Sequence, residues 1–131
     1  MSRIRVAIGQ MPGFLNDTRA NLGQARTLAL QAAADGARLL LLPEGCLTGN
    51  ALSAPDRQSV MSLHPADFAT LQTVADESGI TICAGFHTRV ESRFNAVHAI
   101  LRPRQPARFQ HKTAKSEGEP AFLTPWPDPE R

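Results

Sequence analysis

The sequence predicts a mixed α/β domain, in which helices pack on a sheet that has both parallel and antiparallel strands. One observation is the pattern over residues 3–43, where a period-2 apolar alternation gives way to apolar spacings of three and four, and then to a run of leucines. The other is a succession of three strand-like segments after residue 79. The predicted order is strand, helix, strand, helix and three strands, which differs from the regular alternation of a dinucleotide-binding fold.

Two helices are predicted from the apolar spacing. The first begins at Asn16 or Asp17, either of which can cap a helix, and ends near Gly36. The second begins at residues 64–65, which place a proline in its first turn, and ends at Gly79. The apolar positions that define the two buried faces are Leu22, Ala25, Ala29 and Ala32 in the first helix, and Phe68, Leu71, Val74 and Ala75 in the second.

Five strands are predicted, at residues 3–10, 37–43, 80–86, 94–101 and 107–111. The unbroken leucines at 39–42 favour a central strand that is buried on both faces. Pro43 cannot donate to a strand ladder, so this strand should end there. The loop at 50–63 shows no pattern that identifies its structure or its chemistry.

Composition narrows the classes of partner. The 131 residues are 42% hydrophobic and 20% charged, with a net charge of +2, which is ordinary for a folded domain. A mild basic cluster at residues 102–115 holds one aromatic residue, Phe109, so a stacking platform for nucleic acid is missing. Two cysteines and no long apolar stretch favour a reducing cytoplasm. We therefore expect a cytoplasmic protein with no nucleic-acid or membrane partner.

Glu44 and Lys112 are the first candidates for chemistry, because each follows a predicted strand. Side chains at the carboxyl ends of strands in α/β sheets project into a crevice, where a carboxylate can serve as a general base. A lysine near a reacting carbonyl stabilises the oxyanion that develops there. Each residue taken alone is more often a solvated surface charge. Glu119 is a candidate to orient Lys112, and Glu117 competes for that role.

The remaining reactive side chains have weaker patterns. Cys83 lies inside a predicted strand, where a thiol usually packs as a small hydrophobic group, and we interpret Cys46 as part of the packing of its loop. The histidines at 64, 87, 98 and 111 show no spacing typical of a metal site. No glycine-rich phosphate loop occurs at a strand-to-helix turn. We therefore expect neither a metal nor a cofactor.

Taken together, these segments resemble the nitrilase superfamily of carbon–nitrogen hydrolases over nearly the whole chain. The matching segments follow one another in the family's order, and two blocks carry most of the resemblance: the first is an apolar run that leads to PE and LTG, and the second is a lysine followed by glutamate and F-x-TP. The segments are RVAIGQM (5–11), NDTRANLGQA (16–25), GARLLLLPEGCLTG (36–49), GITICAGF (79–86), NAVHAIL (95–101) and FQHKTAKSEGEPAFLTP (109–125).

The resemblance implies part of an α-β-β-α sandwich, with two helices on one side of a mixed sheet, and a Glu-Lys-Cys catalytic set. By motif, Glu44 is the general base, Lys112 stabilises the tetrahedral intermediate, and Glu119 matches a second glutamate that orients the lysine. The family's nucleophilic cysteine lies beyond the lysine block, so we expect none in this chain. Residues 1–131 are then the N-terminal part of one hydrolase domain. We expect its substrate to be a small amide or nitrile, and the protein to form a homo-oligomer.

Two other interpretations stay open. The chain is alternatively a degenerate nitrilase-like module without catalysis, which would associate with itself because half a sandwich exposes an apolar face and a strand edge. A small flavodoxin-like ligand-binding domain is the third interpretation, which the missing phosphate loop disfavours.

Overall fold

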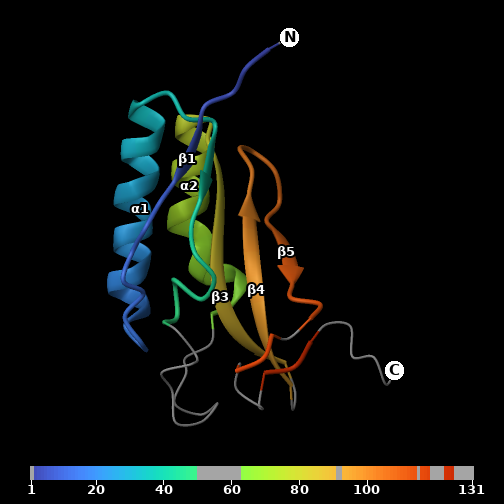
Figure 1. Cartoon of the computed structure of the whole chain (residues 1–131). Helices are drawn as coiled ribbons and strands as arrows, with labels where there is room; N and C mark the ends of the chain where they lie inside the picture. The colour runs from blue at the N-terminus through green and yellow to red at the C-terminus, as the bar shows by residue number, and fades with distance from the viewer. Residues whose placement is uncertain (1, 50–62, 91–92, 115, 119–122, 126–131) are drawn as a thin grey trace.

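The computed structural model shows a five-stranded sheet with two helices packed on one of its faces (Figure 1). It describes residues 2–49, 63–90, 93–114, 116–118 and 123–125. Glu119 and most of the loop at 50–63 lie outside the described residues. The elements are β1 (Val6–Ile8), α1 (Thr18–Ala34), β2 (Leu39–Leu41), the short 3-10 helix η3 (Pro65–Phe68), α2 (Ala69–Ser78), β3 (Thr81–Val90), β4 (Arg93–Leu101) and β5 (Arg108–His111).

The strands lie in the order β1-β2-β3-β4-β5. β1, β2 and β3 are parallel, as strands joined through helices must be, whereas β3, β4 and β5 form an antiparallel meander. The predicted mixed sheet with two helices on one side is therefore confirmed. β3 is longer than the predicted 80–86, because its pairing with β4 continues from His87 to Val90.

Local sequence explains both helices. Asp17 caps α1 by accepting a hydrogen bond from the amide of Ala20 at 3.1 Å, which satisfies one of the free amides of the first turn. The second helix begins as the 3-10 turn η3 and continues directly as α2, which ends at Gly79 in the left-handed conformation (φ 66°). Within the described residues, neither helix is long and apolar enough to cross a membrane.

The main core lies between the helices and the sheet. Alanines 25, 29 and 32 belong to the buried face of α1, and this helix lies close to α2. Three rings of the core, Phe68, Phe86 and Phe109, contact one another edge to face with centroids 4.9–6.0 Å apart. Leu40 and Ile82, which are partners in the sheet, are both fully covered by this core.

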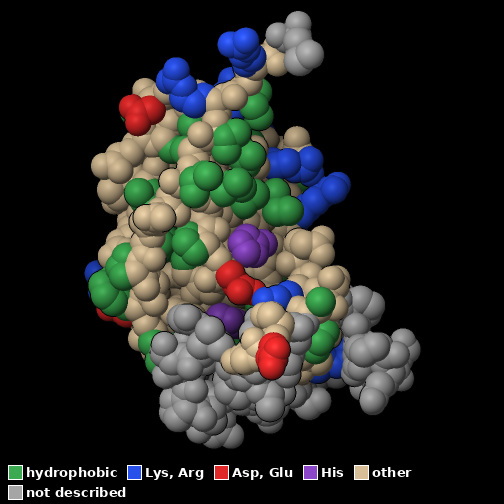
Figure 2. Space-filling view, viewed as in Figure 1, with side chains coloured by type: hydrophobic (Ala, Val, Ile, Leu, Met, Phe, Trp, Pro, Cys, Tyr) green, Lys and Arg blue, Asp and Glu red, His purple; other side chains and the backbone are tan. Residues whose placement is uncertain are grey.

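The opposite face of the sheet is open over its first strands, and we call it the open face. Leu41 is 38% exposed, whereas its neighbour Leu40 is 1% exposed, so the prediction that the leucine strand is buried on both faces is wrong for the described part of the chain. Because strand side chains alternate, Val6 and Ile8 also point to the open face, and they are 45% and 79% exposed. Figure 2 shows hydrophobic side chains gathered over these strands.

Asn21 is a fully buried polar residue of α1 that joins three segments. Its Oδ1 accepts from the amide of Phe14 at 2.9 Å, and its Nδ2 donates to the carbonyls of Phe14 (2.7 Å) and Leu47 (3.2 Å). The helix-face prediction placed Leu22 on the buried side, but Leu22 is only half-buried and Asn21 takes the central position.

We expect Asn21→Ala to lower the free energy of unfolding by about 2–3 kcal/mol, because it removes the hydrogen bonds that Asn21 makes to the amide of Phe14 and to the carbonyls of Phe14 and Leu47. Gln31→Ala is the control, since Gln31 is an exposed residue of the same helix and its change should stay within about 0.5 kcal/mol. Urea unfolding followed by circular dichroism measures both. Equal stabilities of the two variants would contradict the role given to Asn21.

Candidate active site

Two of the three residues singled out by motif come together on the open face. The Lys112 Nζ donates to the Glu44 Oε1 at 2.9 Å, although the two residues are 68 positions apart in the sequence. The side chain of Glu44 is 49% exposed and that of Lys112 is 29% exposed, so water and small molecules reach the pair. The pair thus combines an accessible proton acceptor with an adjacent cationic donor.

Glu44 is positioned by the turn of residues 43–49, which follows β2 and which we call the Glu44 turn. This turn lies directly on Gly85 of β3: a Cβ at Gly85 would meet the amide nitrogen of Gly45 and the carbonyl oxygen of Pro43 at 2.5 Å, and the Cα of Glu44 at 2.6 Å. All three atoms belong to the backbone, so only a glycine on β3 allows this approach.

Hydrogen bonds hold the Glu44 turn against β3. The Gly85 amide donates to the carbonyl of Pro43 at 3.2 Å, and the Leu47 amide donates to the carbonyl of Gly85 at 3.0 Å. Gly45 and Gly49 have positive φ values of 65° and 92°, and the Gly49 amide donates to the carbonyl of Gly45 at 2.8 Å. The two glycines therefore close the turn in a conformation that L side chains rarely adopt.

Lys112 reaches Glu44 from β5, at the far edge of the sheet. It follows β5, and its amide donates to the carbonyl of Ala96 at 2.9 Å, which extends the pairing of β4 and β5 by one residue. His111 points to the helices with its partner Val97, so the alternation of side chains along the strand turns Lys112 to the open face.

The segment at 123–125, which belongs to the second family-like block, lies beside the start of β4. The Thr124 amide donates to the carbonyl of Phe94, and the Asn95 Nδ2 donates to the carbonyl of Thr124, both at 2.7 Å. Leu123 packs with Phe94 and Ala96 in a small second core. The Glu44 turn is thus bonded to β3, and the segment at 123–125 is bonded to the adjacent strand β4.

Of the candidates to orient Lys112, Glu117 is an exposed residue and Glu119 lies outside the described residues. The assignment of that role to Glu119 therefore stays a prediction. Among the described residues, no cluster of three or more His, Cys, Asp or Glu side chains is arranged to hold a metal ion.

The two cysteines differ in their exposure to water. Cys46 is 3% exposed, and its thiol donates to the carbonyl of Gly85 at 3.6 Å. Burial raises the pKa of the Cys46 thiol to about 11, so it is protonated at neutral pH. Cys83 is half-buried on the open face of β3, and burial raises its pKa as well. Neither environment supplies the lowered pKa that activates a thiol nucleophile.

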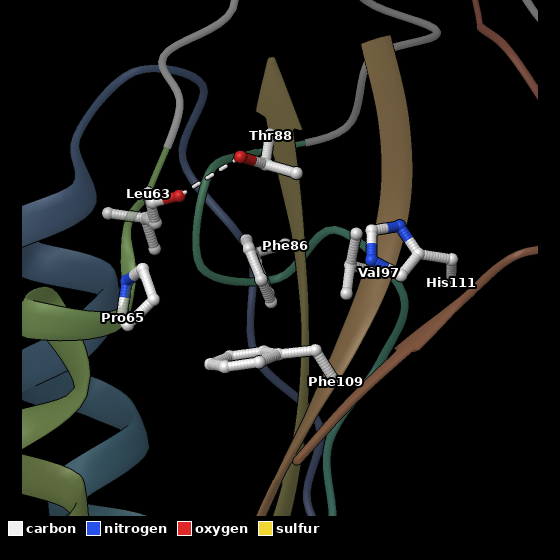
Figure 3. Close-up of a pocket in the computed structure, with 7 residues that line it drawn as sticks. All are labelled: Leu63, Pro65, Phe86, Thr88, Val97, Phe109 and His111. Atoms are coloured by element: carbon white, nitrogen blue, oxygen red, sulfur yellow. Dashed lines mark hydrogen bonds between the residues drawn. The ribbon is translucent and has the colours of Figure 1, made fainter. Parts of the chain in front are cut away.

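A separate pocket of about 150 Å³ lies on the helix face of the sheet. Figure 3 shows its lining, with Thr88 donating to the carbonyl of Leu63 at 3.2 Å. Burial lowers the pKa of His111, the lining residue next to Lys112 in sequence. The lining side chains point away from the open face, so the pocket does not belong to the Glu44–Lys112 site. They are Leu63, Pro65, Phe86, Thr88, Val97, Phe109 and His111.

The sequence analysis gave no role to two residues at this site, Thr48 and His87. Both are buried, at 0% and 4% exposure, and they contact each other below the Glu44 turn. His87 was considered only as a metal ligand. The predicted strand ended at residue 86, directly before His87, and nothing local indicates a partner 39 positions away in the sequence.

The described part of the chain is thus a mixed α/β domain with an accessible Glu–Lys pair at the ends of its strands. The model of the carbon–nitrogen hydrolase family matches residues 5–116. The chain therefore belongs to the carbon–nitrogen hydrolase family. Among curated protein sequences, none matches this chain significantly.

Solved structures support the fold at low sequence identity. The chain is similar to an amidase from Nesterenkonia sp., with a TM-score of 0.72 and 20% identity, over 93% of this chain and 48% of that chain. A mutant of that amidase, which carries the Michael addition product of acrylamide at its active-site cysteine, aligns with a TM-score of 0.72 and 18% identity, over 94% of this chain and 50% of that chain. The chain thus spans about half the length of these amidases.

A glutamine-dependent NAD(+) synthetase from Cytophaga hutchinsonii is similar with a TM-score of 0.73 and 18% identity. The alignment covers 96% of this chain and 22% of the synthetase. An amidase and a synthetase thus both contain a similar sheet with its helices. At this low sequence identity, the similarity shows the fold alone.

The burial of Cys46 leads to a prediction about thiol reactivity. With a pKa of about 11, only about one thiol in a thousand is ionised at pH 8, so Cys46 should react with iodoacetamide far more slowly than Cys83. Mass spectrometry of Cys46→Ser and Cys83→Ser, labelled in the folded state and in urea, measures the two thiols separately. A folded Cys83→Ser protein that is labelled as fast as in urea would contradict the buried position of Cys46.

Proposed function

We propose that this chain supplies the general base and the oxyanion-stabilising lysine of a carbon–nitrogen hydrolase that cleaves small amides or nitriles. The observation that carries the proposal is the 2.9 Å contact between Glu44 and Lys112. It joins the two blocks on which the family resemblance depends. The amidases among the similar structures favour amides as the substrate class.

Each group has a defined step in the proposed mechanism. A cysteine thiol, carried by a segment outside this chain, transfers its proton to the Glu44 carboxylate and attacks the carbonyl carbon of the amide. The Lys112 ammonium donates to the oxygen that becomes negative in the tetrahedral intermediate. The proton on Glu44 then passes to the leaving nitrogen, which departs as ammonia or an amine. Glu44 then takes a proton from water, which attacks the thioester carbon; the carbon–sulfur bond breaks, the carboxylic acid is released, and the proton on Glu44 returns to the cysteine thiolate.

The arrangement of the pair suits this sequence of steps. Because the Lys112 ammonium lies against the Glu44 carboxylate, it holds that side chain in one orientation and provides positive charge within hydrogen-bond reach. Both side chains remain partly exposed, so a substrate can contact them without unfolding the site. An exposed ion pair contributes at most about 1 kcal/mol to stability, so variants of either residue should still fold.

The test uses a protein in which this chain continues into the segment with the nucleophilic cysteine, and it follows ammonia release from acetamide and propionamide. Glu44→Gln should lower kcat/KM by about 10²–10⁴-fold, because it removes the general base. Lys112→Met should lower it by about 10²–10³-fold, because it removes the oxyanion donor.

Arg108→Met is the matched control, since it removes an exposed positive charge from the strand that leads to Lys112. Its kcat/KM should stay within about twofold of the unmodified protein, as expected of a surface substitution away from the site. Wild-type turnover by both Glu44→Gln and Lys112→Met would refute the proposed function.

The open apolar face favours a second candidate, a non-catalytic module that associates with itself. Val6, Ile8 and Leu41 are exposed side by side on neighbouring strands, and such a patch is typical of a protein interface. The module would form dimers that Ile8→Lys dissociates, whereas Leu30→Lys, at a 40% exposed position on α1, would leave them intact. Size-exclusion chromatography with light scattering measures both, and a folded monomer at all concentrations would refute this candidate.

A further inference from the structure

Thr48 and His87 form a double contact beneath the Glu44 turn. The amide of His87 donates to the Thr48 Oγ1 at 3.0 Å, and the His87 Nδ1 lies 2.9 Å from the same oxygen. Both residues are buried, so water cannot replace either interaction. One hydroxyl group therefore serves both the backbone and the side chain of His87.

The Thr48 hydroxyl continues the hydrogen bonding of β3 past the end of β2. Gly85 bonds through its amide and its carbonyl to residues 43 and 47 of the Glu44 turn, and the carbonyl of His87 accepts from the amide of Leu63 at 3.3 Å. At the next position along this strand edge, the His87 amide donates to the side chain of Thr48. The turn is thus bonded to β3 at two successive positions of the strand edge.

The ring of His87 also fixes the turn by its shape. It stacks on Phe94 with centroids 5.4 Å apart and an interplanar angle of 9°. A Cβ at Gly45, the residue after Glu44, would lie 2.8 Å from the His87 Cε1. The imidazole is therefore held between Phe94 and the backbone that carries the general base.

The same residue is next to the strand that presents Lys112. His87 pairs with Ala96 across β3 and β4, and the carbonyl of Ala96 accepts the amide of Lys112. Its stacking partner Phe94 accepts the amide of Thr124 through its carbonyl. His87 consequently contacts the Glu44 turn and the part of β4 that anchors the lysine segment.

We propose that His87, acting through the Thr48 hydroxyl, is a positioning residue that sets the Glu44 carboxylate against Lys112. This role rests on the proposed function, in which Glu44 is the base, and it deepens that function by naming what fixes the base. His87 itself does not touch the substrate in this proposal. The proposal requires the geometry of the pair to depend on a hydrogen bond that neither member of the pair makes.

The experiment measures that geometry by NMR in the 131-residue chain, as the nuclear Overhauser cross-peak between the Glu44 γ-protons and the Lys112 ε-protons. Thr48→Val keeps the side-chain shape and removes the hydroxyl. His87→Phe keeps a ring to stack on Phe94 and removes the Nδ1. We expect the cross-peak to be lost in both variants, and to return in Thr48→Ser and His87→Asn, which restore a polar atom at each place.

Thr88→Val is the matched control. Thr88 lies on the same strand as His87 and is only 9% exposed. Its hydroxyl donates to the carbonyl of Leu63, but it faces the helices. We expect this variant to lose stability and to keep the Glu44–Lys112 cross-peak. A retained cross-peak in folded Thr48→Val or folded His87→Phe would overturn the proposal, and so would its loss in Thr88→Val.

A measurement on the unmodified chain covers the case in which the variants do not fold. The Thr48 hydroxyl proton should exchange slowly with water and show a cross-peak to the His87 ring, whereas exchange at the rate of a free hydroxyl would overturn the proposal. None of these readouts needs turnover. A protein that hydrolyses no amide but shows the expected cross-peaks would therefore refute the proposed function and leave the positioning of Glu44 by His87 intact.

Discussion

The close approach of the Glu44 turn to Gly85 is the constraint on which the candidate site depends. Backbone atoms of residues 43, 44 and 45 occupy the space that any other side chain on β3 would need. Without that approach, the Glu44 carboxylate would stand above the sheet by the thickness of a side chain. Because the turn lies flat on β3, the Glu44 carboxylate reaches a lysine that is presented two strands away, at the end of β5.

The sequence predicted the elements well because their signals are local. The alanine spacing of α1 and the leucine run of β2 depend on neighbours in the chain, and both elements are present. Their limits were less accurate, since β2 pairs on both sides over only Leu39–Leu41. The length of a strand depends on its partners, which the alternation of apolar residues does not reveal.

Two residues of the candidate site could be singled out from the sequence, but not their contact. Glu44 and Lys112 were singled out by family-like motifs, and the structure brings them into contact. The contact between Thr48 and His87 was not predicted because it joins residues far apart in the sequence, and because a threonine in LTG and a histidine just after a predicted strand each have ordinary explanations. The exposure of Leu41 was missed because a run of apolar residues indicates burial without saying which face is covered.

The exposure of the ion pair indicates what kind of interaction it is. Surface pairs of this type contribute little to stability, so the fold gains little from placing Glu44 and Lys112 together. The fold nevertheless devotes a glycine on β3, two glycines with positive φ and a buried threonine–histidine contact to the turn that carries the glutamate. Excluding water would strengthen the pair's field at a reacting carbonyl, because electrostatic interactions grow as the local dielectric falls. The pair lies on the open face, beside the exposed apolar strands, and a surface that covers those strands would also dry the site.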